Sequence, residues 1–146
     1  MSIRVDHHGL TVADLDASVA FFTEVLGFTE ERRAHLTGPF AADVVGVPGA
    51  DIRTAVLALE GSLLELLAYA APVAAAAVSD GPEVPGSMHL AFAVDDLPGI
   101  VAAAAPYGWA PPGRPATMSV GARAGTTFSY LRDGSGATVE LIAAPH

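Results

Sequence analysis

The chain has 146 residues, no cysteine and a formal net charge of −9. This length predicts a single domain with a core of its own, and the absence of cysteine excludes disulfides and thiolate ligands, so any metal must be held by nitrogen and oxygen. The acidic balance argues against nucleic acid and anionic membranes as partners, and because all seven cations are arginines, a Schiff-base lysine is excluded.

The first half begins with a predicted strand over residues 5–12, which are rich in β-branched and apolar types. A helix is expected next, because apolar residues recur at helical spacing up to Gly27, and Asp14 or Asp16 is placed to cap its free amides. Residues 29–53 contain Gly-Pro and Pro-Gly pairs and predict a long loop or a weak strand. This half therefore starts as strand, helix and an irregular stretch.

Two strands complete the first half, over residues 53–59 and 63–69, with a hairpin turn predicted at Gly61 and Ser62. Residues 71–87 are rich in Ala, then in Pro and Gly, and predict the connection between the halves. They separate module 1, about residues 1–70, from module 2, about residues 88–146.

The second half repeats this order. Its predicted elements are a strand over 88–94, a helix over 97–105 that Pro106 stops, and strands over 126–132 and 137–143 around a turn at 133–136. Each half is therefore predicted as βαβββ, which makes the fold class α+β.

An internal repeat relates the two halves. Residues 7–15 (HHGLTVADL) match residues 89–97 (HLAFAVDDL) at an offset of 82, and residues 64–68 (LELLA) match residues 139–143 (VELIA) at an offset of 75. The repeat places His7 opposite His89 and Glu65 opposite Glu140 as equivalent residues. Each glutamate lies between apolar neighbours on a strand, and a buried carboxylate is costly unless it is paired or bound to a metal.

These four residues form a candidate metal site. Two imidazoles and two carboxylates suit a divalent Zn, Ni, Co, Mn or Fe ion, and an octahedral ion keeps two positions for water or substrate oxygens. His7 is chosen over His8 because only one of two adjacent strand residues can face the site, and His7 has the same spacing to Val12 as His89 has to Val94. The repeat therefore predicts a symmetric set of ligands.

The repeat and three motifs, residues 5–28, the run from His89 and the C-terminal residues 130–142, resemble the vicinal oxygen chelate superfamily. That superfamily includes glyoxalase I, methylmalonyl-CoA epimerase, extradiol dioxygenases, fosfomycin-modifying enzymes and bleomycin-type binding proteins. The resemblance covers nearly the whole chain. It implies that two βαβββ modules form a curved, open barrel around the metal, within one chain or across a homodimer.

The resemblance also implies roles for individual residues. Glu65 and Glu140 match positions linked to metal ligation and to proton transfer in the glyoxalase and epimerase groups, and Glu140 is the favoured base. Arg123 and Tyr130 are candidate substrate-binding residues, since the segment from residue 123 leads into the strand beside the site. The expected reaction is therefore a metal-dependent lyase or isomerase reaction, by proton transfer next to a carbonyl group of a small substrate.

Two alternatives remain open at this point. One is a binding protein that sequesters a drug or metabolite, with a pocket framed by residues 29–53 and 110–125; the other is an extradiol-type dioxygenase. Glu65 argues against the dioxygenase, because a fourth protein ligand removes an open metal position. Thr11 departs from glyoxalase I proper, which commonly has an arginine there for glutathione.

The remaining polar and aromatic residues predict ordinary structural roles. Residues 30–33 (EERR) are expected to form a solvated charged face. Surface positions are also expected for His35 and His146. Core positions are expected for the aromatic residues Trp109, Phe21, Phe22 and Phe128. A helix cap is expected at Asp95 or Asp96. The N-terminus lacks the apolar core of a signal peptide, so a cytoplasmic protein without a membrane span is expected.

Overall fold

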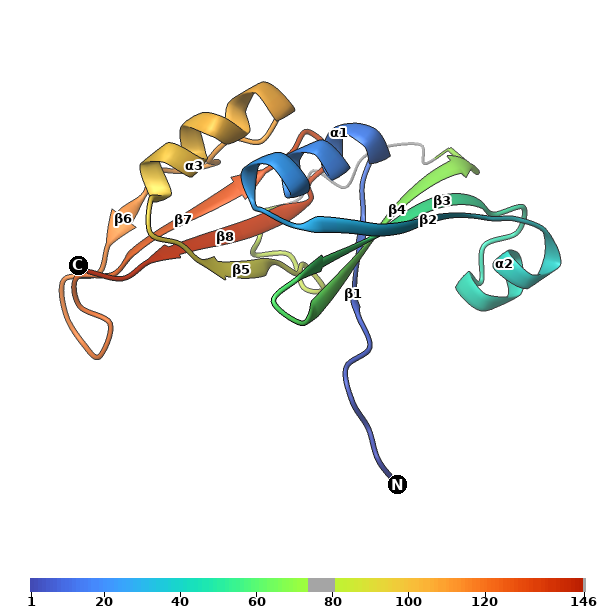
Figure 1. Ribbon diagram of the computed structural model, residues 1–146, viewed down its shortest axis with the longest axis horizontal. Helices are drawn as coiled ribbons and strands as arrows, with labels where there is room; N and C mark the ends of the chain where they lie inside the picture. Colours follow the sequence, from blue (N-terminus) through green and yellow to red (C-terminus); the bar gives the residue numbers. More distant parts are fainter. Residues whose placement is uncertain (74–80, 146) are drawn as a thin grey trace. The chain divides into compact units, whose positions relative to one another are not determined.

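The computed structural model describes residues 1–73 and 81–145, and the contacts between residues divide the chain into two compact units, Met1–Ala76 and Ala77–His146. Each unit contains one four-stranded sheet (Figure 1). Part of the predicted connection, residues 74–80, lies outside the described residues. Within the described ranges, no helix combines the length and apolarity that a membrane span requires.

Unit 1 carries the first sheet, with strand order β1-β4-β3-β2. Its elements are β1 (His8–Thr11), α1 (Leu15–Ala20), a π-helical turn (Phe21–Val25), β2 (Thr29–Leu36), α2 (Gly38–Val45), β3 (Asp51–Leu59) and β4 (Ser62–Ala71). β1 runs parallel to β4, and the other neighbours are antiparallel. Glu65 in β4 therefore lies on the strand next to β1, and His7 is the residue just before β1.

The predicted helix after β1 is confirmed, and so is one of its two candidate caps. The Asp14 carboxylate accepts a hydrogen bond from the Ala17 amide at 3.0 Å. Phe21 and Phe22 are fully buried, and Gly27 follows in the left-handed region with φ 78°. Asp16 has a different role, because its carboxylate pairs with the Arg33 guanidinium.

The expectation for residues 29–53 is confirmed in part, because β2 matches the predicted weak strand, whereas α2 was not expected. The Gly-Pro pair predicted a loop, but a proline fits the first turn of a helix, where its missing amide hydrogen costs nothing. Gly46 ends α2 with φ 69°. The helix is held by packing, since its buried Ala41 contacts Ala50 and Ile52.

The hairpin between β3 and β4 is confirmed, with its turn one residue earlier than predicted. Leu59 pairs with Ser62, so the loop is Glu60 and Gly61. Both loop residues have positive φ, 47° and 81°, as a two-residue turn between antiparallel strands demands. This register sets which face of β4 carries Glu65.

Unit 2 carries the second sheet, with strand order β5-β8-β7-β6. Its elements are β5 (Leu90–Ala93), α3 (Leu97–Ala104), a 3₁₀ turn (Ala105–Tyr107), β6 (Ala116–Thr117), β7 (Thr127–Arg132) and β8 (Thr138–Ala143). β5 runs parallel to β8, as β1 does to β4. The predicted end of the helix before Pro106 is confirmed within one residue, because α3 ends at Ala104 and Pro106 lies in the 3₁₀ turn that follows.

The core of unit 2 lies between α3 and one face of its sheet, and Trp109, Leu131 and Leu141 are buried there. The hairpin between β7 and β8 is organised by Asp133, whose carboxylate accepts hydrogen bonds from the amides of Ser135 and Ala137, each at 2.9 Å. The α+β class with two βαβββ modules is thus confirmed, and α2 is an additional helix in the first module.

The cap of α3 gives a first testable prediction. Asp96 accepts a hydrogen bond from the Gly99 amide at 2.9 Å, so Asp96→Ala is expected to lower the free energy of unfolding by about 1 kcal/mol. Asp95→Ala is the matched control and should change it by less than about 0.5 kcal/mol. Urea denaturation measures both variants, and equal losses would show that Asp96 does not act as the cap.

Candidate functional site

His7 and Glu65 lie together on one face of the first sheet. The His7 Nε2 and Glu65 Oε2 atoms are 3.2 Å apart. Glu65 is the register partner of Gly9 in β1, so the residue two positions earlier, His7, lies on the same face. Leu64 and Leu66 point to the opposite face and are buried. We call the face with Glu65 the site face of unit 1.

Unit 2 repeats this arrangement. The His89 Nε2 and Glu140 Oε2 atoms are 3.3 Å apart, and Glu140 is the register partner of Ala91 as Glu65 is of Gly9. The neighbours of Glu140 on its strand are again fully buried on the opposite face. The carboxylates have similar exposure, 22% for Glu65 and 18% for Glu140. The two His–Glu pairs are therefore alike in geometry and in access to solvent.

The surroundings of the two histidines differ. The Asp6 carboxylate is 2.9 Å from His7 Nδ1, and this hydrogen bond, together with the charge of His7, lowers the pKa of Asp6. A carboxylate only accepts hydrogen bonds, so the contact with Asp6 places a proton on Nδ1. Nε2, which faces Glu65, is the ring atom that could bind a metal. At the equivalent position before His89 stands Met88, which is exposed.

His89 is oriented by an aromatic ring instead. The rings of His89 and Tyr130 have centroids 5.0 Å apart, and Tyr130 is the register partner of Glu140. The Arg123 guanidinium lies 4.9 Å from the ring of Phe128, which shares the face of Tyr130. Phe128 is only partly buried, so its predicted core position was wrong. The structure thus places Tyr130 beside the second pair, with Arg123 farther along the same face.

The charged run at residues 30–33 is more than a solvated face. The Arg33 guanidinium pairs with Glu30 at 2.7 Å and with Asp16 of α1, so Arg33 points to the helix side of the sheet. Arg32 alternates with Arg33 and is the register partner of Val56, which in turn is the partner of Glu65. Arg32 therefore lies on the site face of unit 1. Strand alternation alone does not reveal this position, because the register of β2 shifts between Glu30 and Arg32.

The helix α2 covers another part of the site face of unit 1. Leu67 and Tyr69 follow Glu65 by two and four residues on the same face of β4, and both pack against the buried cluster of Ala41, Ala50 and Ile52. This packing makes an apolar wall along β4 beyond Glu65. Sequence reasoning missed it, because residues 29–53 were expected to form a long loop or a weak strand and not a helix.

The other histidines take no part in the pairs. His8 is the register partner of Leu64, which puts it on the opposite strand face from His7. His35 is exposed, as predicted, and its Nε2 is 2.7 Å from the Asp51 carboxylate. His146 lies outside the described residues.

The donor atoms of the two pairs fit a borderline divalent ion, because imidazole nitrogen and carboxylate oxygen are the ligands that such ions take in cysteine-free sites. Each unit supplies one of each. Within the described part of either unit, no group of three or more His, Asp or Glu side chains is placed to hold a metal. Each unit alone thus supplies two of the four predicted metal ligands. The binding of one ion by all four ligands stays a prediction.

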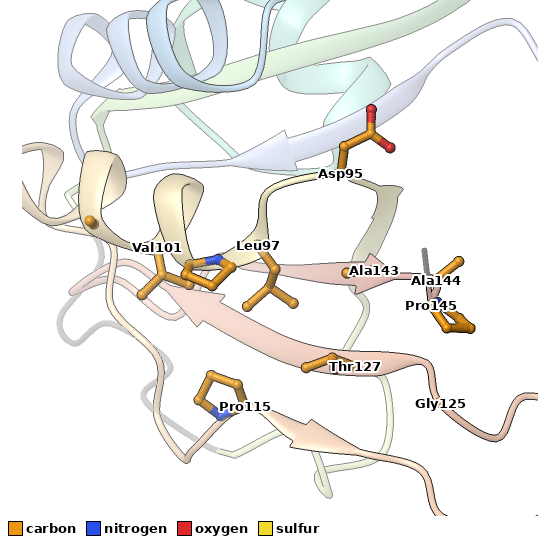
Figure 2. A pocket seen from close by; sticks show the side chains of 11 residues that line it. Asp95, Leu97, Val101, Pro115, Gly125, Thr127, Ala143, Ala144 and Pro145 are labelled. Atoms are coloured by element: carbon orange, nitrogen blue, oxygen red, sulfur yellow. The ribbon is translucent and has the colours of Figure 1, made fainter.

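Unit 2 also contains an apolar cavity of about 550 Å³ on the helix side of its sheet (Figure 2). Leu97 and Val101 of α3 line it from one side, and Thr127 and Ala143 line it from the sheet. Both sheet residues alternate with the face of Glu140, so the cavity belongs to the other side of the sheet. Among the described residues that line the cavity, Asp95 is the one with a charged side chain.

Comparisons with known proteins agree with this architecture. The model of the Glyoxalase/Bleomycin resistance protein/Dioxygenase superfamily matches residues 4–141. A 2-epi-5-epi-valiolone epimerase from Actinomyces sp is 35% identical over 99% of this chain and 81% of its own length. A glyoxalase family protein from Bacillus cereus shares the fold with a TM-score of 0.82 at 22% identity, over 100% of this chain and 97% of that chain. The trypanothione-dependent glyoxalase I of Leishmania major gives a TM-score of 0.58 at 21% identity, over 97% and 87%.

Proposed function

The chain belongs to the glyoxalase/bleomycin resistance protein/dioxygenase superfamily, and from this premise we propose that it is a metal-dependent epimerase, or a related isomerase or lyase. The reaction moves a proton at the carbon next to a carbonyl group of a small substrate. The observation that carries the proposal is the presence of two equivalent His–Glu pairs, at 3.2 and 3.3 Å, on matching strands of the two modules. The epimerase relative supports an inversion as the outcome.

In this proposal one divalent ion is bound by four ligands, His7, Glu65, His89 and Glu140. When bound, the ion supplies Lewis-acid stabilisation of the negative charge that forms on the carbonyl oxygen. The donor set supports this, since a cation between a half-buried carboxylate and an imidazole offsets the cost of removing the carboxylate from water. Asp6 keeps the His7 ring in the tautomer that offers Nε2.

Glu140 is the proposed base, which takes the proton from the carbon next to the carbonyl group. Its register partner is Tyr130, whereas the partner of Glu65 is the apolar Val56. A substrate beside Glu140 therefore meets a phenol that can donate a hydrogen bond, with the Arg123 guanidinium farther along. Inversion requires return of a proton to the opposite face of the carbon, and we assign this return to Glu65.

The proposed substrate is a hydroxylated ketone. The name of the epimerase relative denotes a ketone and an inversion at one centre. A ketone with a hydroxyl group on the next carbon has two neighbouring oxygens, which match the two open positions of an octahedral ion with four protein ligands. The same count disfavours the dioxygenase alternative, because oxygen and a catechol together need more open positions.

Deuterium wash-in tests this function. Metal-loaded protein in heavy water is expected to exchange the proton next to the carbonyl group of an α-hydroxyketone such as dihydroxyacetone at least about 100-fold faster than metal-free protein, because metal-free protein lacks the several kcal/mol of Lewis-acid stabilisation. Mass spectrometry measures the exchange. Oxygen consumption with catechols under Fe²⁺, without any exchange in α-hydroxyketones, hemithioacetals or thioesters, would contradict the proposal.

The cavity in unit 2 favours a second candidate function, binding without catalysis. Its volume of about 550 Å³ lies in the range of small-molecule sites, and Pro115 and Gly125 bring the predicted 110–125 stretch into its lining. This function predicts binding of an apolar ligand that does not depend on metal. It also predicts the same binding when both glutamates are replaced, which separates it from the proposed epimerase.

A further inference from the structure

We propose that Arg32 binds an anionic group of the substrate, a phosphate or a carboxylate, on the site face of unit 1. The proposal rests on the proposed function, and it narrows the substrate from a hydroxylated ketone to one that carries such a group several bonds away from the chelating oxygens. No motif predicts this role, since Arg32 lies in a run that reads as surface charge.

The strand register fixes the side on which Arg32 lies. Arg32, Val56 and Glu65 are consecutive partners across β2, β3 and β4, so their side chains share one face. Arg33 gives an independent check, because its ion pair with Asp16 of α1 ties it to the helix side. A β-bulge between Glu30 and Arg32 shifts the register by one residue, and without it Arg32 would face the helix.

The charge of Arg32 is not neutralised by a contact. Among the described residues, Arg32 has no hydrogen bond or ion pair, and its charge acts on the Asp6 carboxylate only as a longer-range interaction, whereas Arg33 pairs with two carboxylates. A guanidinium with free donors on the same face as Glu65 is suited to a planar or tetrahedral oxyanion, which it can bind through two parallel hydrogen bonds.

The spacing sets the size of the substrate. Glu65 and Arg32 are two strand spacings apart, about 10 Å between backbones, and an arginine side chain bridges more than half of that gap. A ligand that reaches from the carboxylate of Glu65 to the guanidinium of Arg32 is therefore compact, of three to five carbons or a single ring plus its anionic group. The apolar wall of Leu67 and Tyr69 lies along β4 beside this path.

Binding of three related α-hydroxyketones to the metal-loaded full chain tests the proposal. The probes are dihydroxyacetone, which is neutral, dihydroxyacetone phosphate, and 5-hydroxy-4-oxopentanoate, which carries a carboxylate; calorimetry gives each Kd. Arg32→Met is expected to raise the Kd of at least one anionic probe by about 10- to 100-fold, as loss of a charged hydrogen bond does, and to change that of dihydroxyacetone by less than about 2-fold. The probe with the larger loss identifies the group.

Arg53→Met is the matched control. It removes the same charge from the neighbouring strand, but Arg53 is the register partner of Ala68 and His35 on the helix side of the sheet. The control is expected to leave all three Kd values within about 2-fold, because a screened charge at that distance contributes little. Equal losses in both variants would reduce the role of Arg32 to a general charge effect and overturn the proposal.

Two further outcomes separate this proposal from the proposed function. If the three probes bind wild-type protein but Arg32→Met leaves every Kd unchanged, Arg32 is not the anion site, and the epimerase proposal stands. If none of the probes binds metal-loaded wild-type protein, the proposed function and the role of Arg32 are both wrong.

Discussion

Replacing Glu140 by Gln is expected to slow proton exchange next to the substrate carbonyl by about 10²- to 10⁴-fold, the contribution of a positioned general base. Glutamine keeps the size of the side chain and one oxygen ligand but cannot accept the proton. The variant should therefore retain most of the metal. Exchange measured in heavy water and elemental analysis of the same sample check both parts.

Glu65→Gln is the matched comparison, because the two His–Glu pairs agree in distance and exposure. Exchange needs only removal of the proton, so Glu65→Gln is expected to retain more exchange than Glu140→Gln does. The difference must come from the surroundings, Tyr130 beside Glu140 against Val56 beside Glu65. Equal losses, or a larger loss with Glu65→Gln, would contradict the assignment of Glu140 as base.

The features that the sequence predicts well are those that depend on local chemistry. An acidic residue before an apolar helix caps it, as Asp14 and Asp96 do, and the alternation of Leu64, Glu65 and Leu66 separates a buried face from a polar one. The internal repeat adds information on long-range strand pairing, because two equivalent halves are expected to pair equivalent strands. For this reason the sequence identifies the four residues as one symmetric set, whereas the contact of each histidine with its glutamate comes from the structure.

The features that the sequence does not predict depend on tertiary packing. The short helix α2 has a Gly-Pro start that resembles a turn, and tertiary contacts such as those of Ala41 with Ala50 and Ile52 stabilise it. The face of Arg32 depends on a bulge, and the sequence does not mark which residue of a strand is left unpaired. Phe128 is held by Arg123, from a stretch with no regular pattern. These three features lie on the sheet faces that carry Glu65 and Glu140, where we propose that the substrate binds.

Metal stoichiometry tests the central claim most directly, that both His–Glu pairs bind a single ion. Wild-type protein without an affinity tag, incubated with Ni²⁺, Zn²⁺, Co²⁺ or Mn²⁺ in turn and then desalted, is measured by elemental analysis beside His7→Ala and His89→Ala. We expect one ion per chain in the wild type and at least a 10-fold lower metal affinity in either variant, because each substitution removes one of four ligands of the same ion. Two ions per chain, with one lost in each variant, would show that the pairs are independent sites. Retention of none of the four metals by the wild type would show that they are not metal sites.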